Sequence, residues 1–221
     1  MNKLQEYIER YKGLHDGSDA YYQYDGETKE WGLKEADPNR HERQEMFSGV
    51  QFIRKFPSHI KKYIEQKNKK SVSILDYGSG LGQWTWRNYG EYPRGLLGAM
   101  GRNIQSIWLY DPAVEGYDQK PPVDYRFDLV TCSDVMEHIP EEFVEQVVNE
   151  MAMYCKEDGR LIFAISGNPA YKQFEDGENV HCTVKPIEWW EEIIRATDRE
   201  YVIIHADNRR DPIVKIVQRV E

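Results

Sequence analysis

Residues 74 to 82 read Ile74-Leu75-Asp76-Tyr77-Gly78-Ser79-Gly80-Leu81-Gly82. The apolar run from Ser71 to Tyr77 predicts a short buried strand. Three glycines follow at alternate positions, and because glycine lacks a Cβ and reaches positive φ, the backbone can turn sharply there and approach a ligand closely. Ligands in an open α/β sheet bind at the carboxyl ends of its strands. The segment therefore predicts a ligand-binding loop, although a tight strand-to-helix turn would use the same glycines.

Strands and helices alternate from residue 71 onward. Three further apolar runs read as strands: Ile107–Tyr110, Phe127–Cys132 and Leu161–Ile165. A helix with one apolar face opens at Pro140, and a late helix carries Trp189, Trp190, Ile193 and Ile194. Two last strands, Tyr201–His205 and Ile213–Val217, are close enough for an antiparallel hairpin. The pattern predicts an α/β fold: a doubly wound, mostly parallel sheet closed by an antiparallel C-terminal hairpin.

The first 70 residues do not share this alternation. Helical spacing runs from Leu4 to Leu14, and again through Ile60, Tyr63 and Ile64 after a break at Pro57. The Tyr-rich segment between them, Asp16–Arg40, contains Gly26, Gly32 and Pro38 and predicts a loop. A second helical stretch carries Phe47, Val50 and Ile53. We therefore divide the chain into a helical N-terminal extension and lid, residues 1–70, and a Rossmann-like domain, residues 71–221.

Length and composition exclude several classes of protein. A chain of 221 residues suits one α/β domain with a modest extension. Its net charge of −9 does not favour binding to long nucleic acid, which relies on Lys and Arg. The cysteines Cys132, Cys155 and Cys182 form no CxxC pair, and we expect reduced residues, with Cys155 on a helix. With neither a long apolar run nor a signal peptide, the sequence predicts a cytoplasmic protein without a membrane segment.

Three segments resemble the class I S-adenosylmethionine-dependent methyltransferases. The G-x-G-x-G spacing after Asp76 is similar to their motif I; it differs from the dinucleotide pattern G-x-G-x-x-G and lacks the Lys of a P-loop. Asp111 and Pro112 end a strand 29 residues after Gly82, where an acid can accept hydrogen bonds from ribose hydroxyls, although a surface acid before a turn is the alternative. Phe127–Ile139 resembles the FDLV and DVLEHI-like run that follows the fourth sheet strand of the superfamily.

The resemblance implies that the cofactor is S-adenosyl-L-methionine. It assigns cofactor binding to Asp76, Gly78, Ser79, Gly80, Gly82, Gln83, Asp111, Pro112, Asp134 and Val135. It is strong over residues 72–166 and absent from residues 1–70. The sequence departs from the seven-stranded pattern because only 15 residues separate Asp111 from Phe127, where the superfamily has a helix, a strand and another helix. The region of sheet strand 3 must therefore be abbreviated. The sequence does not determine which loop would contact the adenine.

Two histidines are candidate catalytic bases. Methyl transfer requires alignment of acceptor and methyl group and, for a hydroxyl acceptor, removal of a proton, which imidazole can accept near neutral pH. His138 belongs to the segment after the fourth strand, and His181 begins a His-x-Thr-x-Lys-Pro stretch before Trp189 that is similar to one in small bacterial and phage-type methyltransferases. We expect both to face one cavity, partly roofed by the Tyr-rich segment. The alternatives are that the histidines only cap turns and that the tryptophans only pack their helix.

A metal site is considered and not favoured. Asp134, Glu137, His138 and His181 resemble the Glu-x-x-Glu-His and distant His of metal-dependent small-RNA 2′-O-methyltransferases, and these groups could hold a divalent cation. The same EHI-like run is common in methyltransferases that bind no metal, so we expect none here.

The acceptor is expected to be an oxygen or nitrogen of a small molecule or glycan. The alternatives are a nucleic-acid (RNA) methyltransferase, which the acidic balance disfavours, and a catalytically inactive methyltransferase-like binding protein. The intact glycines and Asp111 count against loss of cofactor binding. The sequence leaves the oligomeric state open.

Overall fold

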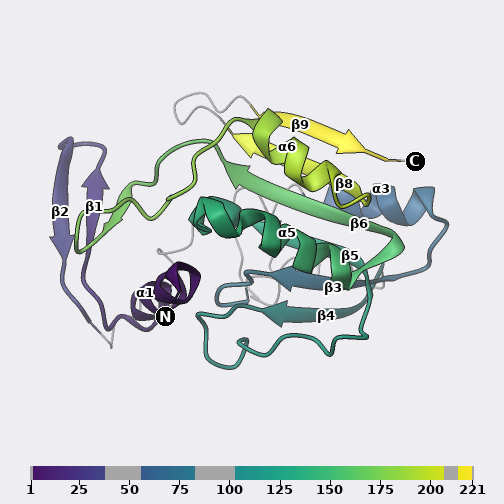
Figure 1. Cartoon of the computed structure of the whole chain (residues 1–221), viewed down its shortest axis with the longest axis horizontal. Coiled ribbons are helices and arrows are strands. Elements are labelled where there is room, and N and C mark those ends of the chain that lie inside the picture. The colour runs from purple at the N-terminus through teal and green to yellow at the C-terminus, as the bar shows by residue number, and fades with distance from the viewer. Residues whose placement is uncertain (1, 38–55, 83–102, 207–213, 221) are drawn as a thin grey trace.

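A computed structural model describes residues 2–37, 56–82, 103–206 and 214–220 (Figure 1). Within them, six strands form the central sheet in the spatial order β4 (Ile104–Tyr110), β3 (Val72–Tyr77), β5 (Phe127–Ser133), β6 (Cys155–Ser166), β8 (Glu200–Ala206) and β9 (Val214–Arg219). Neighbouring strands are parallel from β4 to β8, and β9 pairs antiparallel with β8. The predicted α/β class, parallel sheet and C-terminal hairpin are confirmed.

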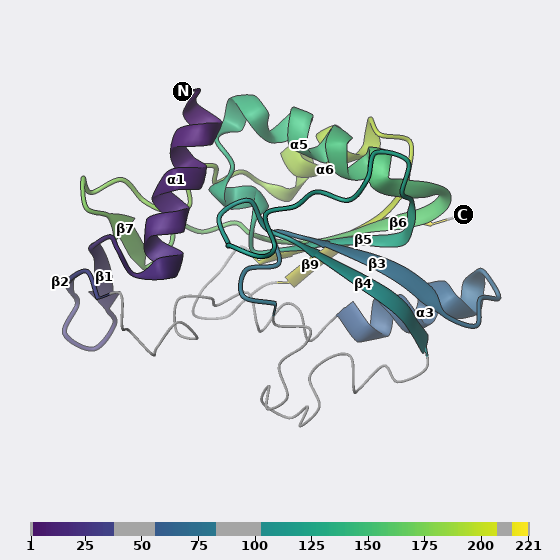
Figure 2. The ribbon, with the colours of Figure 1, turned by 90° about the horizontal axis from the view of Figure 1, so that it is seen from below.

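Helices cover both faces of this sheet. Helices α5 (Glu141–Tyr154) and α6 (Ile187–Arg195) lie on one face and α3 (Phe56–Gln66) on the other (Figure 2). Alternate residues of one strand enter different cores: Leu75 packs with Val148 and Trp190, whereas Ile74 packs with Ile60. This alternation is why the buried strands are apolar along their whole length. Helix α3 belongs to the sheet core although it lies before residue 70; the division of the chain at that residue stays a prediction.

The region of sheet strand 3 is abbreviated, as expected. Residues 111–126, which connect β4 to β5, form turns and no regular helix or strand. Strand β4 is consequently the last strand on its side of the described sheet.

The Tyr-rich segment is not the loop that its glycines and proline predict. It forms a hairpin of β1 (Tyr21–Asp25) and β2 (Glu30–Lys34), and β1 also pairs antiparallel with β7 (Lys172–Phe174). The Asp25 side chain accepts hydrogen bonds from the backbone N–H groups of Glu27 and Thr28, which fixes the turn. The glycines and the proline indicated irregular structure, but the long-range pairing of β1 with β7 gives this segment a neighbouring strand.

Strand β6 is longer than predicted, because it begins at Cys155 and runs through Gly159. Cys155 is therefore a strand residue, not a helical one, and all three cysteines are free. A Cβ at Gly159 would lie 2.7 Å from the Cys155 Sγ and 2.9 Å from the Asp128 carbonyl oxygen. The glycine thus allows a close backbone approach inside the sheet.

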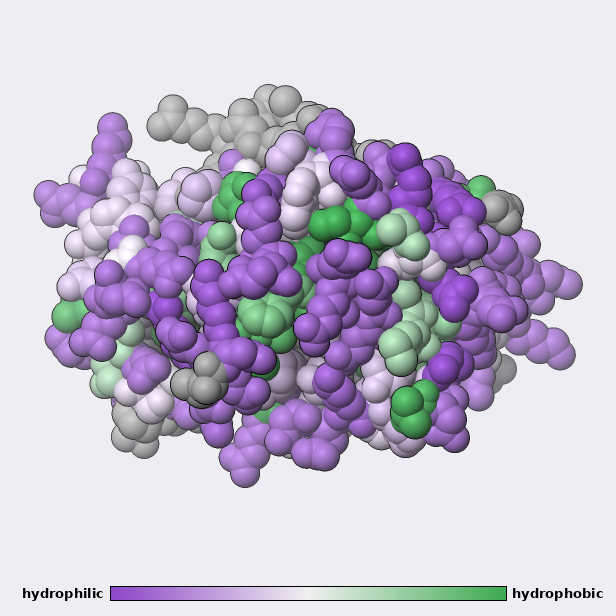
Figure 3. Space-filling view, in the orientation of Figure 1, coloured by the Kyte–Doolittle hydropathy of each residue, from purple (hydrophilic) through white to green (hydrophobic). Residues whose placement is uncertain are grey.

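The N-terminal helix is α1 (Lys3–Asp16), as predicted. The Asn2 side chain caps it by accepting from the Gln5 N–H, and Gly17 ends it in the left-handed region at φ 78°. Figure 2 shows α1 between the β1–β2 hairpin and the first turn of α5, where Lys3 pairs with Glu142. The face seen in Figure 3 is mostly hydrophilic, with apolar residues in small groups. None of the described helices combines the length and apolar character that crossing a membrane requires.

Candidate active site

The glycine loop folds back over the end of β4. Gly78, Gly80 and Gly82 have φ values of 77°, 52° and 76°, a region that residues with a Cβ rarely occupy. The backbone N–H groups of Gly78 and Ser79 both donate to the Tyr110 carbonyl oxygen, at 2.7 and 3.0 Å. The sequence pattern of alternating glycines therefore corresponds to a conformation that depends on them.

Asp111 joins this loop to the end of β4. Its side chain is 8% exposed, and its two oxygens accept hydrogen bonds from the N–H groups of Gly80 (2.8 Å) and Ala113 (2.9 Å). A carboxylate has about four acceptor positions, so it can accept further bonds from a ligand. Pro112 follows at the start of the connection to β5.

Two neighbouring side chains complete the loop. The Ser79 hydroxyl is buried and has no hydrogen-bond partner within the described parts of the chain. Because buried polar atoms are normally paired, this hydroxyl fits a ligand that brings polar atoms into the loop. Asp76 lies beneath the loop, where its carboxylate accepts from the Thr131 hydroxyl at 2.8 Å. Gln83 lies outside the described residues.

The end of β5 packs directly on the glycine loop. Asp134 has a φ of 58° and donates its N–H to the Ala164 carbonyl oxygen of β6. Val135 then contacts the loop so closely that a Cβ at Gly78 would lie 2.3 Å from its Cγ2. The first and third of the recognised segments therefore meet in space.

A 3₁₀ turn, η3 (Met136–His138), presents Glu137 and His138. Glu137 is fully buried; its Oε1 accepts from the Ser166 N–H at 2.7 Å, and its backbone oxygen accepts from the Thr183 N–H at 3.0 Å. Burial first, and then the adjacent Asp134 carboxyl, raises the pKa of Glu137 well above its ordinary value. The Glu137 Oε2 is buried without a hydrogen-bond partner among the described residues.

Two neighbours fix the His138 ring. Its Nδ1 lies 2.9 Å from the Val180 carbonyl oxygen and 2.7 Å from the Tyr11 hydroxyl, which itself donates to the same carbonyl. A carbonyl oxygen only accepts, so Nδ1 carries the proton and Nε2 the lone pair. Burial, and then the neighbouring His181, lowers the pKa of His138 well below its ordinary value. The ring is therefore neutral.

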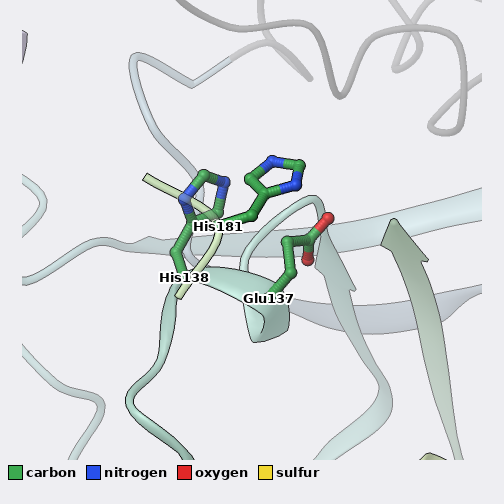
Figure 4. A group of neighbouring side chains, drawn as sticks. All are labelled: Glu137, His138 and His181. Carbon is green, nitrogen blue, oxygen red and sulfur yellow. The ribbon is translucent and has the colours of Figure 1, made fainter. Parts of the chain in front are cut away.

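His181 meets His138 from a distant part of the chain. The ring centroids lie 4.6 Å apart with their planes at 89°, and Figure 4 shows both rings beside the Glu137 carboxylate. Nδ1 of His181 lies 2.6 Å from the Asn168 carbonyl oxygen, which again leaves the lone pair on Nε2. The structure thus brings the two predicted histidines together.

Helix α1 contacts His138 from the N-terminal part of the chain. The expected roof of the Tyr-rich segment stays a prediction. Tyr11 is the residue of α1 that hydrogen-bonds to His138, and sequence reasoning missed this role because Tyr11 looked like one member of an apolar helix face. The tryptophan pair serves the core: Trp190 is fully buried and Trp189 packs on it at 4.8 Å.

A family model described as "Methyltransferase domain" matches residues 40–197. The chain belongs to this methyltransferase family. The match includes the glycine loop, Asp111, η3 and His181, and the family uses S-adenosyl-L-methionine as its methyl donor. The buried Ser79 hydroxyl and the glycine loop fit that cofactor.

Among solved structures, the methyltransferase is similar to 1,6-didemethyltoxoflavin-N1-methyltransferase from Burkholderia thailandensis, determined with 1,6-didemethyltoxoflavin and S-adenosylhomocysteine bound. The TM-score is 0.47 at 13% identity, over 100% of this chain and 92% of that one. No curated protein matches the sequence.

Proposed function

We propose that this methyltransferase methylates an oxygen or nitrogen of a small molecule or glycan, with His138 and His181 on the acceptor side. One observation carries the proposal: the two histidine rings lie next to the glycine loop. Val135, three residues before His138 in the sequence, packs on Gly78 of that loop, and the ring centroids of His138 and His181 lie 4.6 Å apart. Groups suited to proton transfer are thereby adjacent to the loop that suits the cofactor. The cytoplasmic location expected from the sequence is part of the proposal.

The cofactor side consists of the loop and the ends of β4 and β5. The loop backbone at Gly78, Gly80 and Gly82 approaches the cofactor, the Ser79 hydroxyl supplies a hydrogen bond, and Asp111, followed by Pro112, accepts from the ribose. Asp134 and Val135 border the methyl end. Asp76 supports the loop through Thr131. The role of Gln83 stays a prediction.

The chemistry of the acceptor side follows from the tautomers. The bound cofactor supplies a methyl group activated by a sulfonium sulfur. The C–S bond breaks as the new C–O or C–N bond forms, and the acceptor loses one proton. An imidazole with its lone pair on Nε2 can take that proton, and the fixed orientation of the two rings aligns the acceptor for in-line attack. A net charge of −9 favours a small acceptor over a polyanionic nucleic acid.

Calorimetric titration tests the cofactor side. The full chain should bind S-adenosylmethionine and S-adenosylhomocysteine at one site, and binding of NADH in their place would overturn the proposal. Turnover is then assayed as release of S-adenosylhomocysteine over panels of hydroxyl and amine small molecules, glycans and short RNAs. Turnover on RNA alone would replace the small-acceptor class.

A variant tests the acceptor side. His181→Ala should keep its affinity for S-adenosylhomocysteine and lose at least about 90% of turnover, in the range of general acid–base contributions. His59→Ala, on α3 across the sheet, is the matched control and should leave both unchanged. Full activity in His181→Ala would remove that residue from the mechanism.

A further inference from the structure

Glu137, His138 and His181 form a cluster with the composition of a metal site. One ligand atom from each residue lies within 4.8 Å of the other two. Two of the residues come from η3, and the third comes from the segment between β7 and α6 (Figure 4). Two ligands bound about 2.1 Å from one ion at 90–109° lie ~3.0–3.4 Å apart. Side-chain rotations of the order of 1 Å would therefore close the cluster around an ion.

Backbone carbonyls hold both imidazoles in the tautomer that a metal ion needs. His138 Nδ1 is 2.9 Å from the Val180 oxygen, and His181 Nδ1 is 2.6 Å from the Asn168 oxygen. Metal-binding histidines commonly donate their second ring N–H to a carbonyl in this way, which orients the ring and raises the basicity of the ligating nitrogen.

Glu137 supplies an independent observation. The residue is fully buried, and its Oε2 has no hydrogen-bond partner within the described residues although Oε1 accepts from Ser166. A buried acceptor without a partner is costly. A cation between Glu137 and the imidazoles would satisfy this oxygen.

We propose that Glu137, His138 and His181 bind one divalent transition-metal ion that holds an oxygen of the methyl acceptor. Two imidazoles and one carboxylate suit Zn²⁺, Fe²⁺ or Mn²⁺ better than Mg²⁺, and three protein ligands leave positions for a substrate oxygen. The sequence motif alone did not favour an ion, because the same EHI-like run is common in methyltransferases that bind none. The short distances among the three side chains come from the structure.

This inference rests on the proposed function and narrows its substrate class to a hydroxyl acceptor. A bound ion lowers the pKa of a coordinated hydroxyl, so the proton can leave to water while the C–S bond breaks and the C–O bond forms. The imidazoles then act by holding the ion, and this replaces the direct proton transfer to them that is described under the proposed function. His138 and His181 would thus serve the acceptor through the metal.

The test is a titration of ZnCl₂, MnCl₂ and MgCl₂ into the full chain after chelator treatment and dialysis, followed by calorimetry. We expect one site per chain, with Zn²⁺ bound more tightly than Mn²⁺ and Mg²⁺ weakest. His181→Ala and Glu137→Gln should each weaken Zn²⁺ binding at least about tenfold. Glu142→Gln, which alters an exposed acid on α5, is the control and should bind as the parent does.

S-adenosylhomocysteine is titrated into the same samples to separate the two proposals. If it binds but Zn²⁺ does not, or if His181→Ala and Glu137→Gln bind Zn²⁺ as tightly as the parent, the metal site is overturned and the proposed function stands. If Zn²⁺ binds as expected and S-adenosylhomocysteine does not, the three residues are a metal site, but the proposed function fails and with it the role of the ion in methyl transfer. Retained S-adenosylhomocysteine affinity in both variants also shows that they are folded.

Discussion

The Tyr11 hydroxyl lies 2.7 Å from Nδ1 of His138, although the two residues are 127 positions apart. Tyr11 belongs to α1, which Arg10 attaches to the domain: its guanidinium lies over the Phe174 ring at 3.7 Å and pairs with Asp176 and Glu178. Burial raises the pKa of Tyr11 well above its ordinary value, so the hydroxyl keeps its proton. The N-terminal helix therefore orients the predicted catalytic imidazole from outside the matched segments of the domain.

Tyr11→Phe removes this orienting hydroxyl without a large change in volume. Loss of one hydrogen bond corresponds to about 0.5–1.5 kcal/mol, and we expect turnover to fall by about two- to tenfold through kcat. The affinity for S-adenosylhomocysteine should not change. Tyr24→Phe, in the β1–β2 hairpin, is the control. Steady-state kinetics decide the matter, and a Tyr11→Phe enzyme with unaltered kcat would assign the hydroxyl a purely structural role.

Gly78→Ala should damage the site more than the strain of its backbone explains. Gly78 and Gly116 both have positive φ, 77° and 88°, but a Cβ at Gly78 meets Val135 at 2.3 Å, whereas one at Gly116 meets nothing within 4 Å. Gly116→Ala therefore isolates the backbone strain. We expect S-adenosylhomocysteine affinity to fall at least about tenfold in Gly78→Ala and to stay near the parent value in Gly116→Ala. Equal calorimetric affinities for the two variants would show that contact with Val135 is unimportant.

Asp111→Ala should weaken cofactor binding by roughly 1.5–3 kcal/mol, the range for hydrogen bonds to a charged group. The side chain also accepts from Gly80 and Ala113, so its loss loosens the loop as well as removing the ribose contact. Isothermal titration with S-adenosylhomocysteine measures the change, and thermal unfolding checks that the fold survives. Asp124→Ala, an exposed acid in the following connection, is the comparison. Unchanged affinity in Asp111→Ala would move the ribose contact elsewhere.

The parts that sequence predicted well are those in which the signal is local. Apolar runs ending in glycines or acids predicted β3, β5 and the loop, because a strand buried on both faces needs no partner to be recognised. The β1–β2 hairpin was missed because its pairing with β7 joins Tyr22 to Gln173, far away in the chain. Cys155 was wrongly placed on a helix because β6 begins at this residue, and the close contact of Gly159 with Asp128 and Cys155 is not visible in the sequence. The convergence of His138 and His181 followed from topology, but their tautomers depend on carbonyls that no motif encodes.

The final prediction concerns acid stability at the opposite end of the sheet. Asp128 is 4% exposed and accepts hydrogen bonds from the Lys69 ammonium at 2.7 Å and from the Ser73 N–H at 2.9 Å, with Lys156 at 3.0 Å. Burial alone would raise the pKa of Asp128, but the bonds from Lys69, Ser73 and Lys156 outweigh it and hold the pKa well below its ordinary value. A carboxyl whose pKa is lowered in the folded state stabilises the protein fully above its unfolded pKa of about 3.9. This contribution is lost as the pH falls through the folded pKa.

Asp128→Asn replaces the carboxylate with a neutral amide that cannot form these ion pairs or titrate. The variant should be less stable than the parent by about 1–3 kcal/mol near neutral pH. The difference should shrink as the pH falls below about 4. Urea unfolding of both proteins at several pH values measures it, and Asp124→Asn controls for removal of an exposed charge. A stability difference that stays constant down to the acid transition would show that the lowered pKa of Asp128 does not contribute to folding stability.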